Sequence, residues 1–348
     1  MKVKFFEKII AGALIILLVI TNFVACENNK GSAYKKESTT YVKESTSDVS
    51  ELGETVTKES EAIDESTTYY ESEDVYETSV DITELDDDEN FKYPRVDGST
   101  ANMPLMAQIR SDYLNEPLVV SQNNTKVTTT DYAWRSLIDG RSDLLLVYEA
   151  SSETKKIIED SGVELKITPI GVDALVFIEN EGNPVNNLSA EQLQKIYTGE
   201  YKNWKDVGGE DLAIQAFQRP LNSGSQTLFL NLLMKGLTPK KPLKNEEPAE
   251  MGSLIDVIAS YNNSKNAIGY SVFYYAKKMY EVPGLKLISV DGVMPSDESI
   301  GSNKYPFLNK FYVVIREDAD NATKKLYNYI LSDKGKEALI KAGYIPVM

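Results

Sequence analysis

The sequence predicts an α/β fold for residues 91–348. Continuous apolar runs at 144–148, 175–178 and 311–315 have the length of strands that are buried on both faces. The stretches between them show the apolar period and the capping residues of helices. Because buried strands that alternate with helices are typical of parallel sheets, we expect a mainly parallel sheet covered by helices on both sides.

Local signals place the helices within this pattern. Ser189 and Gln192 have the spacing of a capping box, and Gly199 follows as a helix stop. A second helix is expected over about 225–235. The C-terminal stretch 322–342 has a helical apolar pattern that is interrupted near Ser332, which predicts two helices.

An export signal precedes the predicted fold. Lysines near the N-terminus are followed by the apolar run 9–20, which is too short to favour a membrane-spanning helix. Small residues then lead to Cys26, and Phe23-Val24-Ala25-Cys26 resembles the lipobox of bacterial lipoproteins. We therefore expect 1–26 to be a lipoprotein signal peptide and Cys26 to anchor the chain at the extracytoplasmic face of the cell membrane. An uncleaved signal anchor is the alternative, and it also leaves the rest of the chain outside the cytoplasm.

Residues 27–90 differ in composition from the rest of the chain. They carry 20 acidic and 5 basic residues, which accounts for most of the net charge of −16. Such a segment, rich in Ser, Thr, Asp and Glu, buries too little apolar surface to offset its chain entropy. We expect a disordered acidic tether here.

Composition excludes several classes of site. The chain has no histidine and one cysteine, so Ser-His-Asp and Cys-His catalysis, histidine zinc sites and disulfides are excluded. We expect no enzyme activity, no metal and no cofactor, and the acidic mature chain argues against nucleic-acid binding. Ser152 and Lys155 match the S-x-x-K pattern of penicillin-recognising serine enzymes, but no K-T-G follows.

Three predicted loops each end a strand-like run and open a helix with small hydroxyl residues or glycine. At such junctions the unpaired backbone N–H groups and the helix dipole attract an anion. The third loop also carries an arginine, whose planar fork suits an oxyanion. The candidate ligands in these loops are Ser99 and Thr100, then Thr130, then Arg219, Ser223, Gly224 and Ser225.

A carboxylate would let such a site distinguish hydrogen phosphate, which carries a proton, from sulfate, which does not. Glu149 directly follows the predicted strand 144–148, at the end where open α/β sheets bind ligands. Asp143 opens the same strand and is therefore expected at its far end. We therefore expect Glu149 to be the acceptor.

Several motifs occur in an order that resembles a known family. They include Asp97-Gly98-Ser99-Thr100, then Tyr197-Thr198-Gly199 through Asn203-Trp204, then Arg219 to Gln226, and finally Gly343-Tyr344-Ile345-Pro346. From Tyr93 to the C-terminus the chain resembles the phosphate-binding proteins of phosphate ABC importers, which have the two-lobed type II periplasmic-binding-protein fold.

The resemblance implies an organisation and a function. One lobe would comprise 91–171 with 305–348, the other 172–304, and the segments 169–178 and 305–315 would form the hinge between them. It implies a monomer that binds phosphate or a related oxyanion in the cleft and passes it to ABC permease subunits. The same resemblance gives the loop residues named above as ligand contacts. A surface sensor or adhesin without a transport role is the alternative on the same scaffold.

Overall fold

The computed structural model describes residues 92–243, 246–259 and 265–347. All of them fall within one compact unit, Ser79–Met348. The expected signal peptide, Cys26 and the acidic tether lie outside the described residues. Within the described part of the chain, no helix has the length and apolar character needed to cross a membrane.

The centre of the fold is a mixed sheet in the order β1-β2-β9-β3-β6-β5, in which β10 and β7 also pair with β3. A small second sheet joins β4 (Asn187–Leu188) to β8 (Ser289–Val290). The strands of the large sheet are β1 (Val96–Gly98), β2 (Leu144–Tyr148), β3 (Leu165–Asn180), β5 (Gln215–Ala216), β6 (Ala267–Val272), β7 (Leu285–Leu287), β9 (Leu308–Arg316) and β10 (Ile345–Pro346).

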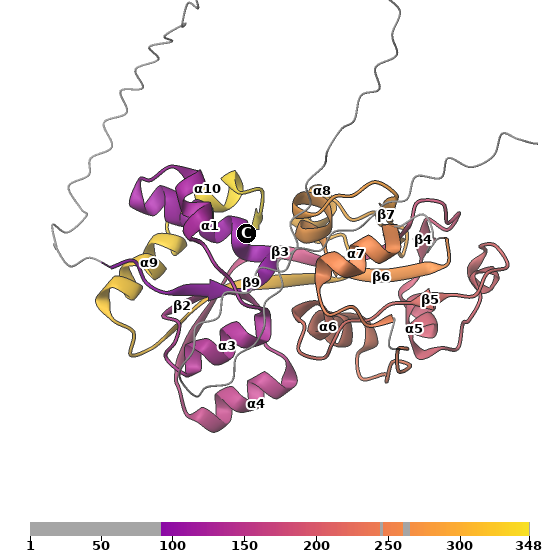
Figure 1. The fold of residues 1–348 in the computed structure, drawn as a ribbon, viewed down its shortest axis with the longest axis horizontal. Helices are drawn as coiled ribbons and strands as arrows, with labels where there is room; N and C mark the ends of the chain where they lie inside the picture. Colours follow the sequence, from indigo (N-terminus) through magenta and orange to yellow (C-terminus); the bar gives the residue numbers. More distant parts are fainter. Residues whose placement is uncertain (1–91, 244–245, 260–264, 348) are drawn as a thin grey trace, which may run out of the picture. The chain divides into compact units, whose positions relative to one another are not determined.

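The long strand β3 divides the sheet into two parts. Residues 165–174 of β3 pair with β9, and residues 175–179 pair with β6. We call the elements around β1, β2 and β9 the first lobe, and those around β5, β6 and β7 the second lobe. Figure 1 shows β3 and β9 as the strands that lead from one group of helices to the other. The chain therefore has the expected two-lobed α/β fold.

The expectation of a mainly parallel sheet is wrong. Only the pairs β1–β2 and β5–β6 of the large sheet are parallel, whereas β2–β9, β3–β9, β3–β6, β3–β7 and β3–β10 are antiparallel. Every residue of β2 is buried, because helices cover both faces of this part of the sheet. A continuous apolar run reports burial on two faces, and an antiparallel strand covered on both sides has the same pattern.

The first lobe contains the helices that follow two of the three expected ligand loops, at Ser99 and at Thr130. Two separate helices form the C-terminal stretch, as predicted, and Ser332 caps the second of them by accepting from Gly335 N–H. The helical segments are η1 (Thr100–Asn102), α1 (Met103–Leu114), α2 (Leu118–Asn124), α3 (Thr130–Ile138), α4 (Ser152–Ser161), α9 (Asn321–Leu331) and α10 (Asp333–Lys341).

The second lobe confirms the other local helix signals. The Ser189–Gln192 capping box is formed in both directions, and Gly199 ends that helix with a φ of +80°. The predicted helix near 225–235 exists as α6 followed without a break by the π-helical η3. The helical segments are α5 (Ala190–Thr198), η2 (Trp204–Val207), α6 (Gly224–Leu228), η3 (Phe229–Met234), α7 (Met251–Ala259), η5 (Tyr275–Met279) and α8 (Asp297–Gly301).

An aromatic cluster anchors α6 and η3 on the sheet of the second lobe. Tyr270 of β6 stacks on Phe229 with ring centroids 4.4 Å apart, and Tyr197 meets Phe229 edge to face at 4.7 Å. Phe177 of β3 completes the cluster from the neighbouring strand. All four residues are buried, and each such ring pair adds about 0.5–1.5 kcal/mol beyond the burial of its area. The start of α6 is thereby held on a rigid base.

Candidate functional site

Ser99 lies in the turn between β1 and α1, where it is buried. Its N–H donates to the carbonyl oxygen of Leu146 on β2 at 3.1 Å, and the carboxylate of Asp97 accepts the N–H of Gly98. Gly98 permits this close approach, because a Cβ there would overlap the Leu146 carbonyl oxygen. The turn is therefore fixed against the sheet, with Thr100 and the start of η1 directly after it.

The hydroxyl groups of Ser99 and Thr130 lie 2.8 Å apart. Thr130 is the first residue of α3, and Tyr148 N–H donates to Ser99 Oγ at 3.0 Å. One hydroxyl proton occupies the bond between Ser99 and Thr130, so the other hydroxyl proton of the pair is free to bind a ligand. The first turn of α3 adds backbone N–H groups that have no acceptor within the helix.

Ser223, Gly224 and Ser225 form the start of α6 in the second lobe. The Oγ atoms of Ser223 and Ser225 lie 3.1 Å apart. Gly224 lies directly against Thr130, since a Cβ on Gly224 would overlap Thr130 Oγ1 and come within 3.0 Å of Thr130 Cβ. Only glycine allows the starts of α3 and α6 to meet at this distance. We call Ser99, Thr130, Ser223, Gly224 and Ser225 the donor cluster.

Arg219 is tied to the helix that carries half of the donor cluster. Its backbone N–H donates to Gln226 Oε1 of α6 at 3.1 Å and to the hydroxyl of Tyr270 at 3.0 Å. Tyr270 in turn donates to Gln226 Oε1. These contacts fix the backbone of Arg219 relative to the first turn of α6.

The guanidinium of Arg219 is buried and only partly paired. Its Nη2 donates to the carbonyl oxygen of Ala249 at 2.9 Å, whereas Nε and Nη1 have no hydrogen-bond partner among the described residues. Burial lowers the pKa of Arg219, and its electrostatic interactions with Tyr270, Tyr275 and Glu250 act in the opposite direction. A buried cation with unused N–H groups is costly unless an anion meets it. The arrangement is therefore suited to an oxyanion.

Two further candidates from the sequence lie at the edge of this arrangement. Thr100 directly follows Ser99 and is exposed. Glu149 follows β2 as expected, and its carboxylate pairs with Lys155 Nζ and accepts from Asn231 Nδ2 of η3 at 3.4 Å. Glu149 thus lies between the two lobes, where its described contacts are with these two side chains.

No sequence signal distinguished two buried polar residues that lie beside the site, Tyr270 and Asn102. The hydroxyl of Tyr270 accepts from the backbone N–H of Arg219 and donates to Gln226 Oε1. Asn102, at the end of η1, is completely buried, and both amide atoms of its side chain lack a partner among the described residues. The motif that contains Gln226 placed it beside the ligand contacts, whereas no local signal distinguished Tyr270 or Asn102.

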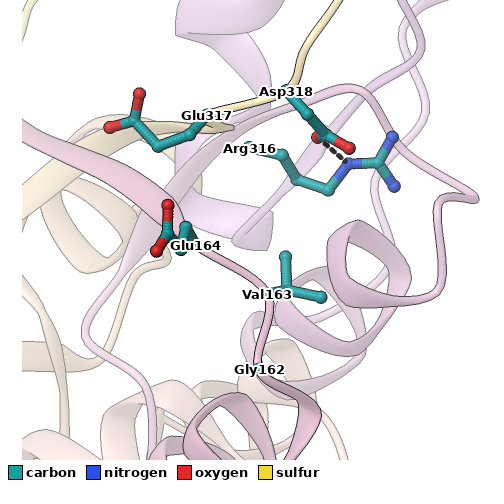
Figure 2. Close-up of a pocket in the computed structure, with 6 residues that line it drawn as sticks. All are labelled: Gly162, Val163, Glu164, Arg316, Glu317 and Asp318. Atoms are coloured by element: carbon teal, nitrogen blue, oxygen red, sulfur yellow. Dashed lines mark ion pairs between the residues drawn. The ribbon is translucent and has the colours of Figure 1, made fainter.

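A separate hollow of about 350 Å³ lies at the outer end of β3 and β9, and Figure 2 shows the residues that line it. Its arginine, Arg316, is paired with Asp318 at 3.2 Å. Glu164 and Glu317 also line the hollow, so its charge would repel an anion. None of its lining residues belongs to the donor cluster.

The chemistry available at the donor cluster is binding by hydrogen bonds and charge. Among the described residues, no group of three or more acidic, histidine or cysteine side chains could hold a metal ion. Lys155 of the S-x-x-K pattern is engaged by Glu149, and Ser152 is the first residue of α4. The arrangement as a whole presents donors to a small anion.

A family model described as "PBP superfamily domain" matches residues 93–334. The chain belongs to the PBP superfamily. The resemblance read from the motifs, to phosphate-binding proteins with this fold, is thereby confirmed. The match spans both lobes and every residue of the donor cluster.

Two phosphate-binding proteins are similar to this chain over most of their own length. The chain is 29% identical to the phosphate-binding protein PstS of Borreliella burgdorferi over 266 residues, which cover 74% of this chain and 91% of that protein. It is 23% identical to the phosphate-binding protein PstS of Bacillus subtilis over 257 residues, which cover 72% and 80%.

Solved structures confirm the superfamily fold. A putative phosphate ABC transporter substrate-binding protein with bound phosphate from Clostridium perfringens aligns with a TM-score of 0.59 at 23% identity. An ABC-type phosphate transport receptor from Vibrio cholerae aligns with a TM-score of 0.56 at 21% identity. Each alignment covers 74% of this chain and all of the other chain.

Proposed function

We propose that the chain is an extracytoplasmic solute-binding protein that captures phosphate, or a similar small oxyanion, for import by an ABC transporter. The observation that carries the proposal is the buried guanidinium of Arg219, whose Nε and Nη1 have no partner in the described part of the chain. The start of α3 in the first lobe meets the start of α6 in the second, where Thr130 lies against Gly224. The names of the relatives, which are phosphate-binding proteins, support this ligand class.

The proposal assigns roles to the parts of the chain. The two lobes would comprise 91–171 with 305–348 and 172–304, and they would close on the anion about β3 and β9. Glu149 would accept the proton of hydrogen phosphate. The other ligand contacts would be Ser99, Thr100, Thr130, Arg219, Ser223, Gly224 and Ser225.

The remaining features describe how the protein would work at the cell surface. Residues 1–26 would direct export, Cys26 would carry the lipid anchor, and 27–90 would tether the binding domain to the membrane. A monomer would deliver the anion to permease subunits. The protein would bind its ligand reversibly, without catalysis, metal or cofactor.

Titration calorimetry of the purified protein with phosphate tests the proposal. Wild-type protein should bind phosphate, and Arg219→Ala should weaken binding by at least about 100-fold, because charge-assisted hydrogen bonds from Nε and Nη1 would be lost. Arg141→Ala is the matched control, since Arg141 pairs with Asp139 at the surface. Absence of phosphate binding by the wild type, or equal affinities of wild type and Arg219→Ala, would contradict the proposal. The first result would favour a surface sensor or adhesin.

A further inference from the structure

Asp173 lies in β3 at the point where the strand changes partners. Ala174, the next residue, is the last of β3 to pair with β9. From Leu175 onward β3 pairs with β6. The side chain of Asp173 is 3% exposed. A buried carboxylate at this position is in reach of both lobes.

The carboxylate accepts hydrogen bonds from each side of the junction. The hydroxyl of Tyr148, at the end of β2 in the first lobe, donates to Oδ2 at 2.7 Å. The N–H of Tyr274, two residues after the end of β6 in the second lobe, donates to Oδ1 at 3.2 Å, and the N–H of Ala174 donates to Oδ1 at 2.7 Å. Asp173 therefore joins the two lobes through its side chain.

Tyr148 and Tyr274, which both donate to Asp173, also connect it to the segment that contains Ser99 and Ala101. Tyr148 N–H donates to Ser99 Oγ, so the residue that binds Asp173 also orients a cluster hydroxyl. Tyr274 stacks on Tyr344 with ring centroids 3.6 Å apart, and Tyr344 donates to the carbonyl oxygen of Ala101 at 2.6 Å. Both paths end in the turn that contains Ser99.

The junction holds Asp173 in an unusual electrostatic state. Burial raises the pKa of Asp173 to about 6, although hydrogen bonds from Tyr148 and from backbone N–H groups lower it. The titratable groups that face it are Tyr148 from β2, Tyr274 from the segment after β6, and Tyr344 from the segment before β10. Asn309 lies opposite on β9 and carries no charge. Protonation of Asp173 therefore changes the charge of the junction.

We propose that Asp173 is a positioning residue that favours the closed, anion-binding arrangement of the lobes through its bond to Tyr148. The inference rests on the proposed function. The described arrangement is a closed one, because Gly224 of the second lobe lies against Thr130 of the first. On this proposal the bonds to Asp173, which coexist with this contact, are kept in the closed arrangement and weakened when the lobes open.

Tyr148→Phe tests this role, because it removes the hydroxyl and keeps both the ring and the N–H that orients Ser99. The dissociation constant for phosphate is measured by calorimetry from pH 5 to pH 8, and the ratio of variant to wild type cancels the ionisation of phosphate itself. The ratio should be about 10 at pH 8, since a hydrogen bond to a buried charge is lost. It should fall toward 1 at pH 5, where Asp173 of the wild type is protonated.

Controls separate this role from a general structural one. Tyr312 of β9 lies opposite Val147 of β2, next to Tyr148. Tyr312→Phe is the control for loss of a tyrosine hydroxyl and should leave the affinity unchanged. Asp173→Asn should also weaken binding at pH 8. This variant serves as the test if Tyr148→Phe fails to fold. A ratio that equals 1 throughout, or that exceeds 1 without changing with pH, would overturn the inference. Loss of phosphate binding by the wild type would instead overturn the proposed function.

Discussion

Glu179 provides a test of how burial controls the stability of the second lobe. It lies on β3 and is completely buried, and neither carboxylate oxygen has a hydrogen-bond partner among the described residues. Lys286 Nζ lies 3.9 Å from Glu179 Oε2 and donates to the carbonyl oxygens of Asn183 and Val185. Burial raises the pKa of Glu179 to about 8, and Lys286 only partly opposes this shift.

The sign of the effect follows from linkage. The folded protein keeps the proton on Glu179 up to about pH 8, whereas the unfolded chain releases it near 4.5. Stability from this group is therefore complete below pH 4.5 and is lost as pH rises toward 8. A difference of about 3.5 pH units at 1.36 kcal/mol each sets an upper limit of about 5 kcal/mol. The pKa of about 8 already includes the opposing charge of Lys286, so we expect Glu179→Gln to stabilise the protein by about 3 to 5 kcal/mol at pH 8.5 and by little at pH 5.

Urea unfolding followed by circular dichroism measures this difference. The midpoint of Glu179→Gln should exceed that of the wild type by about 1 M at pH 8.5, and the two should coincide at pH 5. Glu181→Gln, two residues away and exposed, is the matched control and should change neither midpoint. The reasoning is refuted if Glu179→Gln is less stable than the wild type at pH 8.5, or if its effect is the same at both pH values.

Two more predictions concern the contact between the lobes. Gly224→Ala should weaken phosphate binding at least about tenfold while changing the melting temperature little, because the added methyl group meets Thr130 only when the lobes close; calorimetry showing unchanged affinity would mean that these helix starts do not meet around the ligand. Glu149→Gln should lower the preference for phosphate over sulfate about tenfold, whereas Lys155→Gln leaves the carboxylate in place and should preserve it. A preference that survives Glu149→Gln would remove Glu149 from the acceptor role.

Local sequence signals predicted the elements of the fold well. The capping box at Ser189, the stop at Gly199 and the break at Ser332 all depend on residues within a few positions of each other, so the sequence contains the whole signal. The start of α3 at Thr130 and of α6 at Gly224 could be located for the same reason. The direction of the strands could not be predicted, because a strand buried on both faces gives the same continuous apolar run whether its neighbours are parallel or antiparallel.

The support of the candidate site depended on contacts between distant parts of the chain. Asp173 stands within an apolar strand, and its bond to Tyr148 exists only because β2 and β3 both flank β9. Tyr270 binds the backbone of Arg219 from a strand 51 residues further along the chain. The spacing of residues along the chain does not indicate such contacts. The motifs therefore located the donor residues but not the side chains that fix their positions.

The shared strand β3 also bears on how such a protein can evolve and be engineered. Its first part pairs with β9 in the first lobe and its last part with β6 in the second, so removing either lobe would leave a bare, unpaired edge along the other. Bare edges recruit strands from other chains and lead to aggregation. A single lobe therefore cannot be isolated by deleting the other unless the deletion also supplies a strand, or a charged or covered edge, in place of the lost partner.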